Sequence, residues 1–302
     1  MINITKLTKI YNSKKVVNEL TLEIPKGEIF GLLGPNGAGK STAIRMLCSI
    51  IKPDAGEARI AGFDLFKQQK EIKKNIGYMS QNFGLYAKLS VIENIRFYAT
   101  LYGVNDEKKI KKLIKTYQID QYKDYKAGEL SGGYKRRLSL VCALIHDPKI
   151  LFLDEPTAGI DPVTRKELWD LFFQLSAEGK TLFVTTHYME EAQRCNRVAF
   201  LNHGKMVTIG DPKRVKNSLT DTTAYTYEGD FDLKMISLLK ASKGVVLVNQ
   251  FGDIVKILID KQIDKIELQK IMKPFIKEEF VLKSAEINLE DVFIVMTQKK
   301  RS

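Results

Sequence analysis

The feature that most constrains the fold is a glycine-rich segment of eight residues near the N-terminus. Residues 34–41 read GPNGAGKS and fit the pattern G-x-x-x-x-G-K-[ST], between an apolar stretch over 28–33 and a helical pattern over 40–50. Glycines let backbone N–H groups turn inward around phosphate oxygens, and the following helix presents its positive N-terminus. A strand, this loop and a helix in that order predict a phosphate-binding P-loop.

The residues of this loop have separate predicted roles. Lys40 is predicted to reach the β- and γ-phosphates of a nucleotide, and the Ser41 hydroxyl to bind Mg²⁺. A chance match is the alternative, but these fixed positions should coincide in only about one chain in a hundred of this length. The predicted nucleotide-binding residues of the loop are Gly34, Pro35, Asn36, Gly37, Ala38, Gly39, Lys40, Ser41 and Thr42.

A second element of the site is the apolar segment ILFLDE at residues 150–155. A buried strand that ends in a carboxylate places Asp154 at the carboxyl end of a sheet, where ligands bind. Asp154 is predicted to hold Mg²⁺ through water, and Glu155 to polarise an attacking water as general base. Many buried strands end in Asp, so this motif gains its weight from the P-loop before it.

The chain has two parts with different patterns. Up to about residue 210, strand-like and helix-like segments alternate, which predicts an α/β layer with a largely parallel sheet. A polar stretch over 211–223 marks a boundary. Beyond it the predicted order is β-α-β-β-α-β followed by a helix, which suggests a small ferredoxin-like unit.

Composition excludes several classes of protein. Of the 302 residues 44% are hydrophobic, enough for a core, but no apolar run approaches the roughly 20 residues of a membrane-spanning helix. The first residues lack the apolar core of a secretory signal. The three cysteines, Cys48, Cys142 and Cys195, are widely spaced, which fits a reducing cytoplasm.

The formal net charge of +12 is unevenly distributed. Residues 216–302 hold 14 basic and 13 acidic residues, so the surplus belongs to the first part of the chain. Two readings of the lysines there stay open, a solvated helix face and attraction to an anionic membrane leaflet. The lysines form two groups: Lys67, Lys70, Lys73 and Lys74, then Lys108, Lys109, Lys111, Lys112 and Lys115.

Between the two phosphate-site segments lies LSGGY at residues 130–134, and with it the sequence resembles the nucleotide-binding subunits of ABC transporters. The resemblance spans roughly residues 2–215. The matching elements occur in the family's order: Tyr11, the P-loop at 34–41, Gln81, the signature at 130–134, Asp154 with Glu155, a D-loop-like segment at 158–162 that contains Asp161, and His187 after Thr186.

The resemblance implies a fold and a domain organisation. The fold would be a P-loop NTPase of ABC type, in which a mixed β-sheet core carries a helical subdomain, followed by a small α+β domain. The nucleotide-binding domain would cover residues 1–217, with its helical subdomain at about 84–146. Residues 222–302 would form an accessory or regulatory domain.

The resemblance also assigns roles to residues outside the P-loop. Tyr11 would stack on adenine, as aromatic side chains do on bases. Gln81 and His187 would join Glu155 as the catalytic set, Gln81 by touching Mg²⁺ and the attacking water and His187 by contacting the γ-phosphate. The metal set would be Ser41, Gln81 and Asp154.

The signature would act on the nucleotide of another chain. Ser131, Gly132, Gly133 and Tyr134 would begin a helix whose N–H groups face the γ-phosphate bound by the partner protomer, with Asp161 at the dimer seam. Tyr134 departs from the family pattern, because the fifth position is usually Gln or a similar polar residue. Because of this difference, the resemblance does not define the local hydrogen bonding near the ribose or the dimer seam.

The implied assembly is a head-to-tail dimer, with itself or with a related ABC subunit, that binds ATP and Mg²⁺ and drives a polytopic membrane permease. Softer similarities, such as LEDVF at 289–293, favour ATPases of bacterial drug or antibiotic export that serve ABC-2-type permeases. The subunit would then be cytoplasmic and peripheral on the inner face of the cell membrane, with no nucleic acid expected. Two alternatives remain, a soluble ABC-type ATPase acting on nucleic acid or ribosomes and the ATPase of a solute importer.

Overall fold

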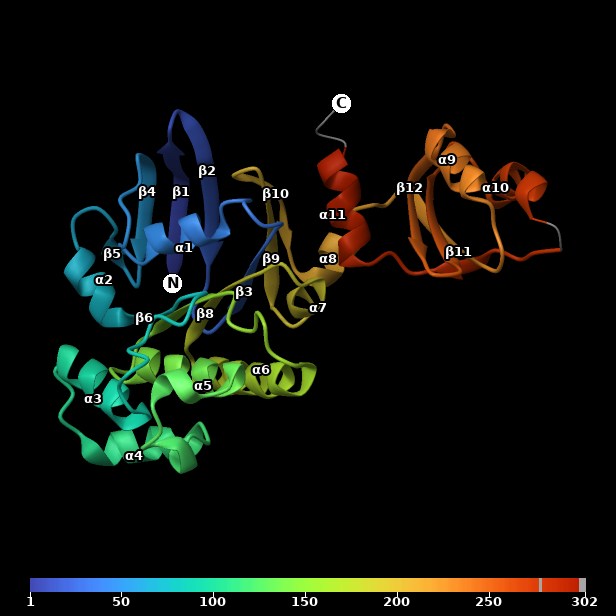
Figure 1. Ribbon diagram of the computed structural model, residues 1–302. Coiled ribbons are helices and arrows are strands. Elements are labelled where there is room, and N and C mark those ends of the chain that lie inside the picture. Colours follow the sequence, from blue (N-terminus) through green and yellow to red (C-terminus); the bar gives the residue numbers. More distant parts are fainter. Residues whose placement is uncertain (277–278, 299–302) are drawn as a thin grey trace. The chain divides into compact units, whose positions relative to one another are not determined.

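The computed structural model describes residues 1–276 and 279–298 (Figure 1). The chain divides into two compact units, Met1–Ile209 and Gly210–Ser302. Each unit has its own sheets and core, so each is described by itself.

The first unit contains an antiparallel sheet that the alternating sequence pattern did not predict. Its strand order is β2-β1-β4-β5. The long first two strands pair from Ile2 with Ile24 to Tyr11 with Lys14, and alternate residues of β2 are buried, as expected for a sheet with one covered face. The strands are β1 (Ile2–Tyr11), β2 (Lys14–Ile24), β4 (Ala55–Ile60) and β5 (Phe63–Asp64).

The second sheet of this unit is the predicted α/β layer. Its order is β10-β9-β3-β8-β7-β6, and the pairs from β9 through β6 are parallel. The central strands β3, β7 and β8 are buried throughout, because the layer is covered on both faces. The strands are β3 (Ile29–Leu33), β6 (Ile76–Met79), β7 (Ile150–Asp154), β8 (Thr181–Thr186), β9 (Arg197–Asn202) and β10 (Lys205–Gly210).

Parallel pairing brings the carboxyl ends of three strands together. Leu33 on β3 pairs with Thr186 on β8, and Asp154 on β7 pairs with Thr185. The segments after these strands therefore start from the same edge of the sheet. Four helices belong to this layer: α1 (Lys40–Leu47), α2 (Gln69–Asn75), α6 (Pro162–Ala177) and α7 (Met189–Ala192).

Helix α1 is shorter than the pattern over 40–50 predicts. It ends at Leu47, and Ser49 then adopts a positive φ of 54°. A residue in the left-handed region commonly ends a helix, because it turns the chain out of the helical path.

A group of helices between β6 and β7 lies together in Figure 1. Helix α3 begins with a capping box, in which the Ser90 hydroxyl accepts from Glu93 N and the Glu93 carboxylate accepts from Ser90 N. Asp106 caps α4 in a similar way. The helices of the group are α3 (Val91–Leu101), α4 (Glu107–Thr116), the short turns Asp120–Tyr122 and Ala127–Glu129, and α5 (Gly132–Leu144).

The second unit has the element order that the sequence suggested. Its sheet order, β12-β13-β11-β14, is antiparallel throughout and is that of a ferredoxin-like fold. Apolar side chains of α9 and α10 pack on one sheet face, and those of α11 on the other. The elements are α8 (Pro212–Lys216), β11 (Thr222–Glu228), α9 (Leu233–Ala241), β12 (Val245–Phe251), β13 (Ile254–Asp260), α10 (Lys265–Met272), the turn Lys273–Phe275, β14 (Lys283–Ala285) and α11 (Leu289–Gln298).

The part of the chain that the structure describes contains no helix with both the length and the apolar character needed to cross a membrane.

Candidate active site

The P-loop is built so that glycine alone fits at two of its positions. A Cβ on Gly34 would lie 2.2 Å from the Leu201 carbonyl oxygen, and one on Gly39 would lie 2.4 Å from the Val16 carbonyl oxygen. Gly39 also has a φ of 105°, which side-chain-bearing residues rarely adopt. Gly39 forms the N-cap of α1 without a capping side chain, so the first N–H groups of this helix form a site for an anion.

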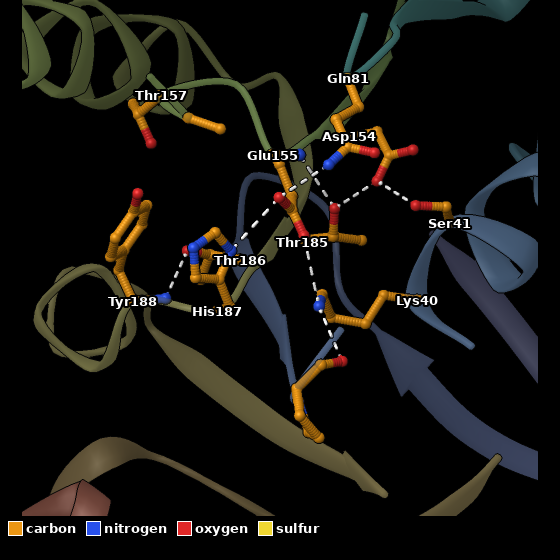
Figure 2. A network of polar contacts seen from close by, with 12 residues as sticks. Lys40, Ser41, Gln81, Asp154, Glu155, Thr157, Thr185, Thr186, His187 and Tyr188 are labelled. Atoms are coloured by element: carbon orange, nitrogen blue, oxygen red, sulfur yellow. Dashed lines mark hydrogen bonds and ion pairs between the residues drawn. The ribbon is translucent and has the colours of Figure 1, made fainter. Parts of the chain in front are cut away.

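Lys40 is nearly buried at the start of α1, with 4% of its surface exposed. Its ammonium donates to the Gly34 carbonyl at 2.7 Å and the Pro35 carbonyl at 3.2 Å, and lies 3.3 Å from Glu155 Oε1. Figure 2 shows the side chain extending along the loop toward Glu155. The loop thus holds a positive charge at its own centre, where phosphate oxygens would be neutralised.

Asp154 ends β7 and is fully buried. Its Oδ1 accepts from the Ser41 hydroxyl at 3.1 Å and the Thr185 hydroxyl at 2.6 Å, which joins the P-loop to β8. Its Oδ2 is buried and has no hydrogen-bond partner among the described residues. Burial, and secondarily this carboxylate, raise the pKa of Tyr78 to about 12, so the neighbouring phenol stays neutral.

Glu155 turns out of the strand direction, with a φ of 46°. Its backbone N–H donates to the carbonyl and hydroxyl oxygens of Thr185, at 3.1 and 3.0 Å. This turn points its side chain away from Asp154 and toward three donor-bearing side chains (Figure 2). Gln81 Nε2 donates to Glu155 Oε2 at 3.0 Å, and His187 Nδ1 lies 3.2 Å from the same oxygen, outside hydrogen-bond geometry.

A buried carboxylate fixes the segment that carries His187. Glu191 is 1% exposed and accepts hydrogen bonds from the hydroxyls of Thr157 and Thr186. The Thr186 hydroxyl in turn accepts from the Tyr188 backbone N–H at 3.0 Å. These bonds tie the residues on both sides of His187 to the segment that follows Glu155, so the orientation of the imidazole is set by its neighbours.

The P-loop, Gln81 and Glu155 border a cavity of about 270 Å³ at the carboxyl edge of the parallel sheet. Its lining combines the backbone of the P-loop with the Gln81 and Glu155 side chains, and includes Val16 from β2, which the sequence analysis did not identify. The lining residues are Val16, Asn36, Gly37, Gly39, Lys40, Ser41, Thr42, Gln81 and Glu155.

Several predicted residues do not line this cavity, and His187 and Asp154, which contact its lining residues, are among them. Tyr11 lies at the end of β1, is 44% exposed and has the Lys9 ammonium 5.1 Å from its ring centre. The signature residues form the N-terminal turn of α5 and take no part in the lining. Asp161 caps α6 by accepting from the backbone N–H groups of Val163 and Thr164. The hydrogen bond from the Thr164 hydroxyl, followed by those from the backbone, lowers the pKa of Asp161.

The donor groups of the site fit Mg²⁺ only if phosphates and waters supply the remaining ligands. The described residues contain no group of three or more acidic, histidine or cysteine side chains that could enclose a metal ion. Three oxygen-bearing side chains are nevertheless present. Ser41 offers a hydroxyl, Asp154 a carboxylate with an unpartnered buried oxygen, and Gln81 an amide. Mg²⁺ is commonly held by one or two protein groups together with phosphates and waters, and these residues match that requirement.

Comparison with known proteins identifies the family. The family model described as ABC transporter matches residues 17–158. Nod factor export ATP-binding protein I of Rhizobium sp. (strain N33) is 41% identical over 215 residues, which cover 70% of this chain and 71% of that protein. The chain belongs to the ABC transporter ATP-binding protein family. Its fold is the P-loop ABC fold that the sequence predicted.

Another relative extends well beyond the matched region. The probable multidrug ABC transporter ATP-binding protein YbhF of Escherichia coli (strain K12) is 39% identical over 219 residues, which cover 72% of this chain but 38% of the relative. The present chain thus spans well under half the length of that ABC protein.

Solved ABC cassettes share the fold of the larger part of the chain. The dimeric, post-hydrolysis structure of the ATP-binding cassette MJ0796, bound to ADP and Pi, superposes with a TM-score of 0.66 at 25% identity and covers 70% of this chain and 98% of that one. The cassette cbiO1 from Clostridium perfringens, part of the transporter complex cbiONQ, gives a TM-score of 0.65 at 27% identity, with 72% and 91% covered.

Proposed function

We propose that this ABC ATPase hydrolyses ATP in the P-loop cavity to drive export through a separate membrane permease. The observation that carries the proposal is that Lys40, Gln81 and His187 all lie at the Glu155 carboxylate, which borders the cavity of the P-loop. Each side chain comes from a different segment, and each offers the charge or hydrogen bond that phosphoryl transfer to water requires.

In the proposed reaction, a water attacks the γ-phosphorus and the bond from that phosphorus to the β-bridging oxygen breaks, releasing ADP and phosphate. Glu155 accepts a proton from the water, Gln81 and His187 orient the water and the γ-phosphate, and Lys40 neutralises the phosphate oxygens. Lys40 must exchange at least one of its present partners, the Gly34 or Pro35 carbonyl or Glu155, to do so.

We propose that Ser41, Gln81 and Asp154 hold Mg²⁺ together with the nucleotide. The buried, unpartnered Oδ2 of Asp154 supports this assignment, since a buried carboxylate oxygen without a hydrogen bond is costly unless a cation or an ordered water satisfies it. When bound, the ion would draw charge from the phosphate oxygens during transfer.

The complete site is proposed to need a second chain. The signature lies outside the P-loop cavity of its own chain, and its two glycines differ in what this chain requires of them. A Cβ on Gly133 would lie 2.6 Å from Thr164 Cγ2, so close packing of α5 on α6 explains this glycine. A Cβ on Gly132 would meet only ordinary contacts of 3.6 Å or more, which leaves its N–H face open to close approach by a phosphate of the partner.

In this dimer Ser131 and Asp161 would lie at the seam with the partner, and Tyr11 would stack on the adenine. The exposed side chain of Tyr11 is free of aromatic partners among the described residues, which suits a stacking role. Closure on two ATP molecules would be favoured by contacts to the γ-phosphates, and hydrolysis would remove those contacts.

The membrane partner and location are also proposals. The names of the relatives, multidrug transport and Nod factor export, support a permease of an exporter. Helix α4 offers a positively charged surface for the anionic leaflet. Its Glu107 carboxylate accepts hydrogen bonds from Arg96 at 2.9 and 3.2 Å. The helix also carries four exposed lysines, Lys108, Lys111, Lys112 and Lys115. Residues 222–302, in the second unit, are proposed to form an accessory or regulatory domain.

The test is to isolate the protein from membranes with its copurifying polytopic partner and to measure ATP-dependent transport in vesicles. The proposal predicts outward transport by the wild-type pair and none by a pair that carries Lys40→Ala. Inward transport by the pair would show that the protein serves an importer and not an exporter. Sedimentation with RNA or ribosomes, without a membrane partner, would contradict the proposal.

A further inference from the structure

Arg136, in the second turn of the signature helix α5, joins three segments of the active site. Its Nη1 donates to the backbone carbonyl of Gln81 at 2.8 Å and to that of Ser80 at 3.3 Å. Its Nη2 donates to the carbonyl of Ala158 at 3.2 Å, at the start of the D-loop segment. One guanidinium therefore bonds the segment that carries Gln81 and the segment that follows Glu155.

Both segments lead to the proposed general base. Gln81, whose backbone is held by Arg136, donates through its side chain to Glu155 Oε2 at 3.0 Å. Ala158 is linked to Glu155 by a turn in which Ala158 N donates to the Glu155 carbonyl at 3.2 Å. A displacement of Arg136 would thus shift Glu155 and its water-orienting neighbour together.

The position suits arginine and not lysine. Two separate nitrogens of a planar group each reach a different segment, whereas a lysine ammonium is a single point. Arg136 is half-buried, and this burial lowers its pKa while the charges of Glu155 and Asp154 oppose the shift. The group keeps its charge, because an arginine is not deprotonated in proteins.

We infer that Arg136 is a positioning residue that transmits the placement of the signature helix to Gln81 and Glu155. It touches no substrate; it acts by holding the backbone of two segments against α5. When α5 engages the partner's nucleotide, these bonds align the hydrolytic groups of its own chain. The inference rests on the proposed roles of Gln81, Glu155 and the signature.

The neighbouring basic residues behave differently, which supplies a matched control. Arg137 points to the helical group, where it donates to the Tyr117 carbonyl at 3.2 Å and pairs with Glu167 at 2.5 Å. The Lys135 ammonium lies 5.7 Å from the ring centre of Phe83, and in the described part of the chain the side-chain hydrogen bonds to the Gln81 and Ala158 carbonyls come from Arg136. Lys135→Gln therefore removes one charge from the same helix turn and leaves the three bonds of Arg136 intact.

The experiment compares steady-state ATP hydrolysis by the full chain as wild type, Arg136→Gln, Arg136→Lys and Lys135→Gln, with rates normalised to folded protein. Arg136→Gln should lower kcat by about 10- to 100-fold while KM changes by less than about threefold, since positioning is lost and the ATP contacts remain. Arg136→Lys should recover part of kcat, and Lys135→Gln should match wild type.

A second variant pair tests the route of the effect. Because Arg136 is inferred to act partly through Gln81, adding Arg136→Gln to Gln81→Ala should lower kcat by less than it does in the wild type. Full additivity, an unchanged kcat in Arg136→Gln, or a loss explained by the fraction of unfolded protein would overturn the inference. A wild type that hydrolyses no ATP would instead contradict the proposed function.

Discussion

The two units each contain a buried lysine–carboxylate pair, and the comparison between them separates the proposed active site from a structural contact. In the first unit, Lys40 lies 3.3 Å from Glu155. In the second unit, Lys256 lies 2.6 Å from Asp291, and both residues are less than 10% exposed. The two pairs are alike in residue type and burial, so neither property alone identifies a reactive group.

Both lysines also donate to backbone carbonyls, so the pairs differ in the remaining partners of their carboxylates. Lys256 also donates to the Glu286 carbonyl at 2.7 Å, and Asp291 also accepts from Asn288 N at 2.8 Å, so fixed backbone groups complete this pair. It connects β13 with the start of α11. Glu155 instead borders a cavity and is surrounded by the side chains of Gln81 and His187. Side-chain partners at a cavity can exchange when a ligand enters, whereas backbone partners inside a core cannot.

The largest effect should come from Glu155→Gln, which keeps the size of the side chain and removes its basicity. We expect ATP hydrolysis to fall by about 10²- to 10⁴-fold, the contribution of general base catalysis, while ATP still binds. Phosphate release measured over single and multiple turnovers checks this. Glu57→Gln, on the exposed side of β4, is the control; a Glu155→Gln variant with wild-type turnover would remove Glu155 from the mechanism.

Asp291→Ala should break the structural pair and leave the active site untouched. An unpaired buried lysine costs about 3–5 kcal/mol, so the free energy of unfolding of the second unit should fall by that amount. Denaturant unfolding measures the loss, and a titration should show unchanged ATP affinity. The double variant Lys256→Met with Asp291→Leu should restore much of the stability; if it is less stable than Asp291→Ala, the pair is not acting as described.

Lys40→Ala tests the other side of the comparison. Because a charge-assisted hydrogen bond contributes about 1.5–3 kcal/mol, ATP affinity should fall by about 10- to 100-fold. The stability of the chain should change little, since the Gly34 and Pro35 carbonyls and Glu155 become reachable by water through the cavity. Lys52→Ala, at an exposed position, should bind ATP as the wild type does. Unchanged affinity in Lys40→Ala would contradict the P-loop assignment.

Much of the architecture follows from the sequence because its signals are local. Glycines at residues 34 and 39, a carboxylate at the end of an apolar strand and the Ser90–Glu93 capping box each depend on short spacing. The ferredoxin-like order of the second unit was likewise readable from alternating short elements. The sheet order is consistent with these elements. With antiparallel neighbouring strands and with α9 and α10 on one face of the sheet, few topologies are possible.

Other features depend on contacts between distant segments, and the sequence does not display them. The alternating pattern does not reveal that β1 joins the β2 hairpin to β4, because β1 and β4 pair across more than 40 residues. Val16 reaches the cavity only because β2 passes close to the P-loop at Gly39. Thr185 and Arg136 act through backbone groups of other segments, and no local motif marks such a partner.

The smallest effect is expected at Tyr134, where the sequence departs from the family pattern. Its ring packs 4.2 Å from that of Tyr122, and its hydroxyl accepts from Gln121 Nε2 at 3.4 Å. These contacts are internal to the helical group, so Tyr134→Gln should change kcat and KM for ATP by less than about threefold. Tyr134→Phe separates the ring from the hydroxyl. A tenfold loss in Tyr134→Gln would instead show that the ring meets the nucleotide or the partner.

The central claim is that the cavity of one chain is completed by the signature of another, and molar mass in solution tests it most directly. Light scattering on Glu155→Gln should give a monomer without nucleotide and a dimer with ATP. Adding Gly132→Asp should leave ATP binding in place but keep the protein monomeric, because a carboxylate would repel the partner's phosphates. A Glu155→Gln protein that stays monomeric while saturated with ATP, or a dimer that is indifferent to Gly132→Asp, would contradict the account.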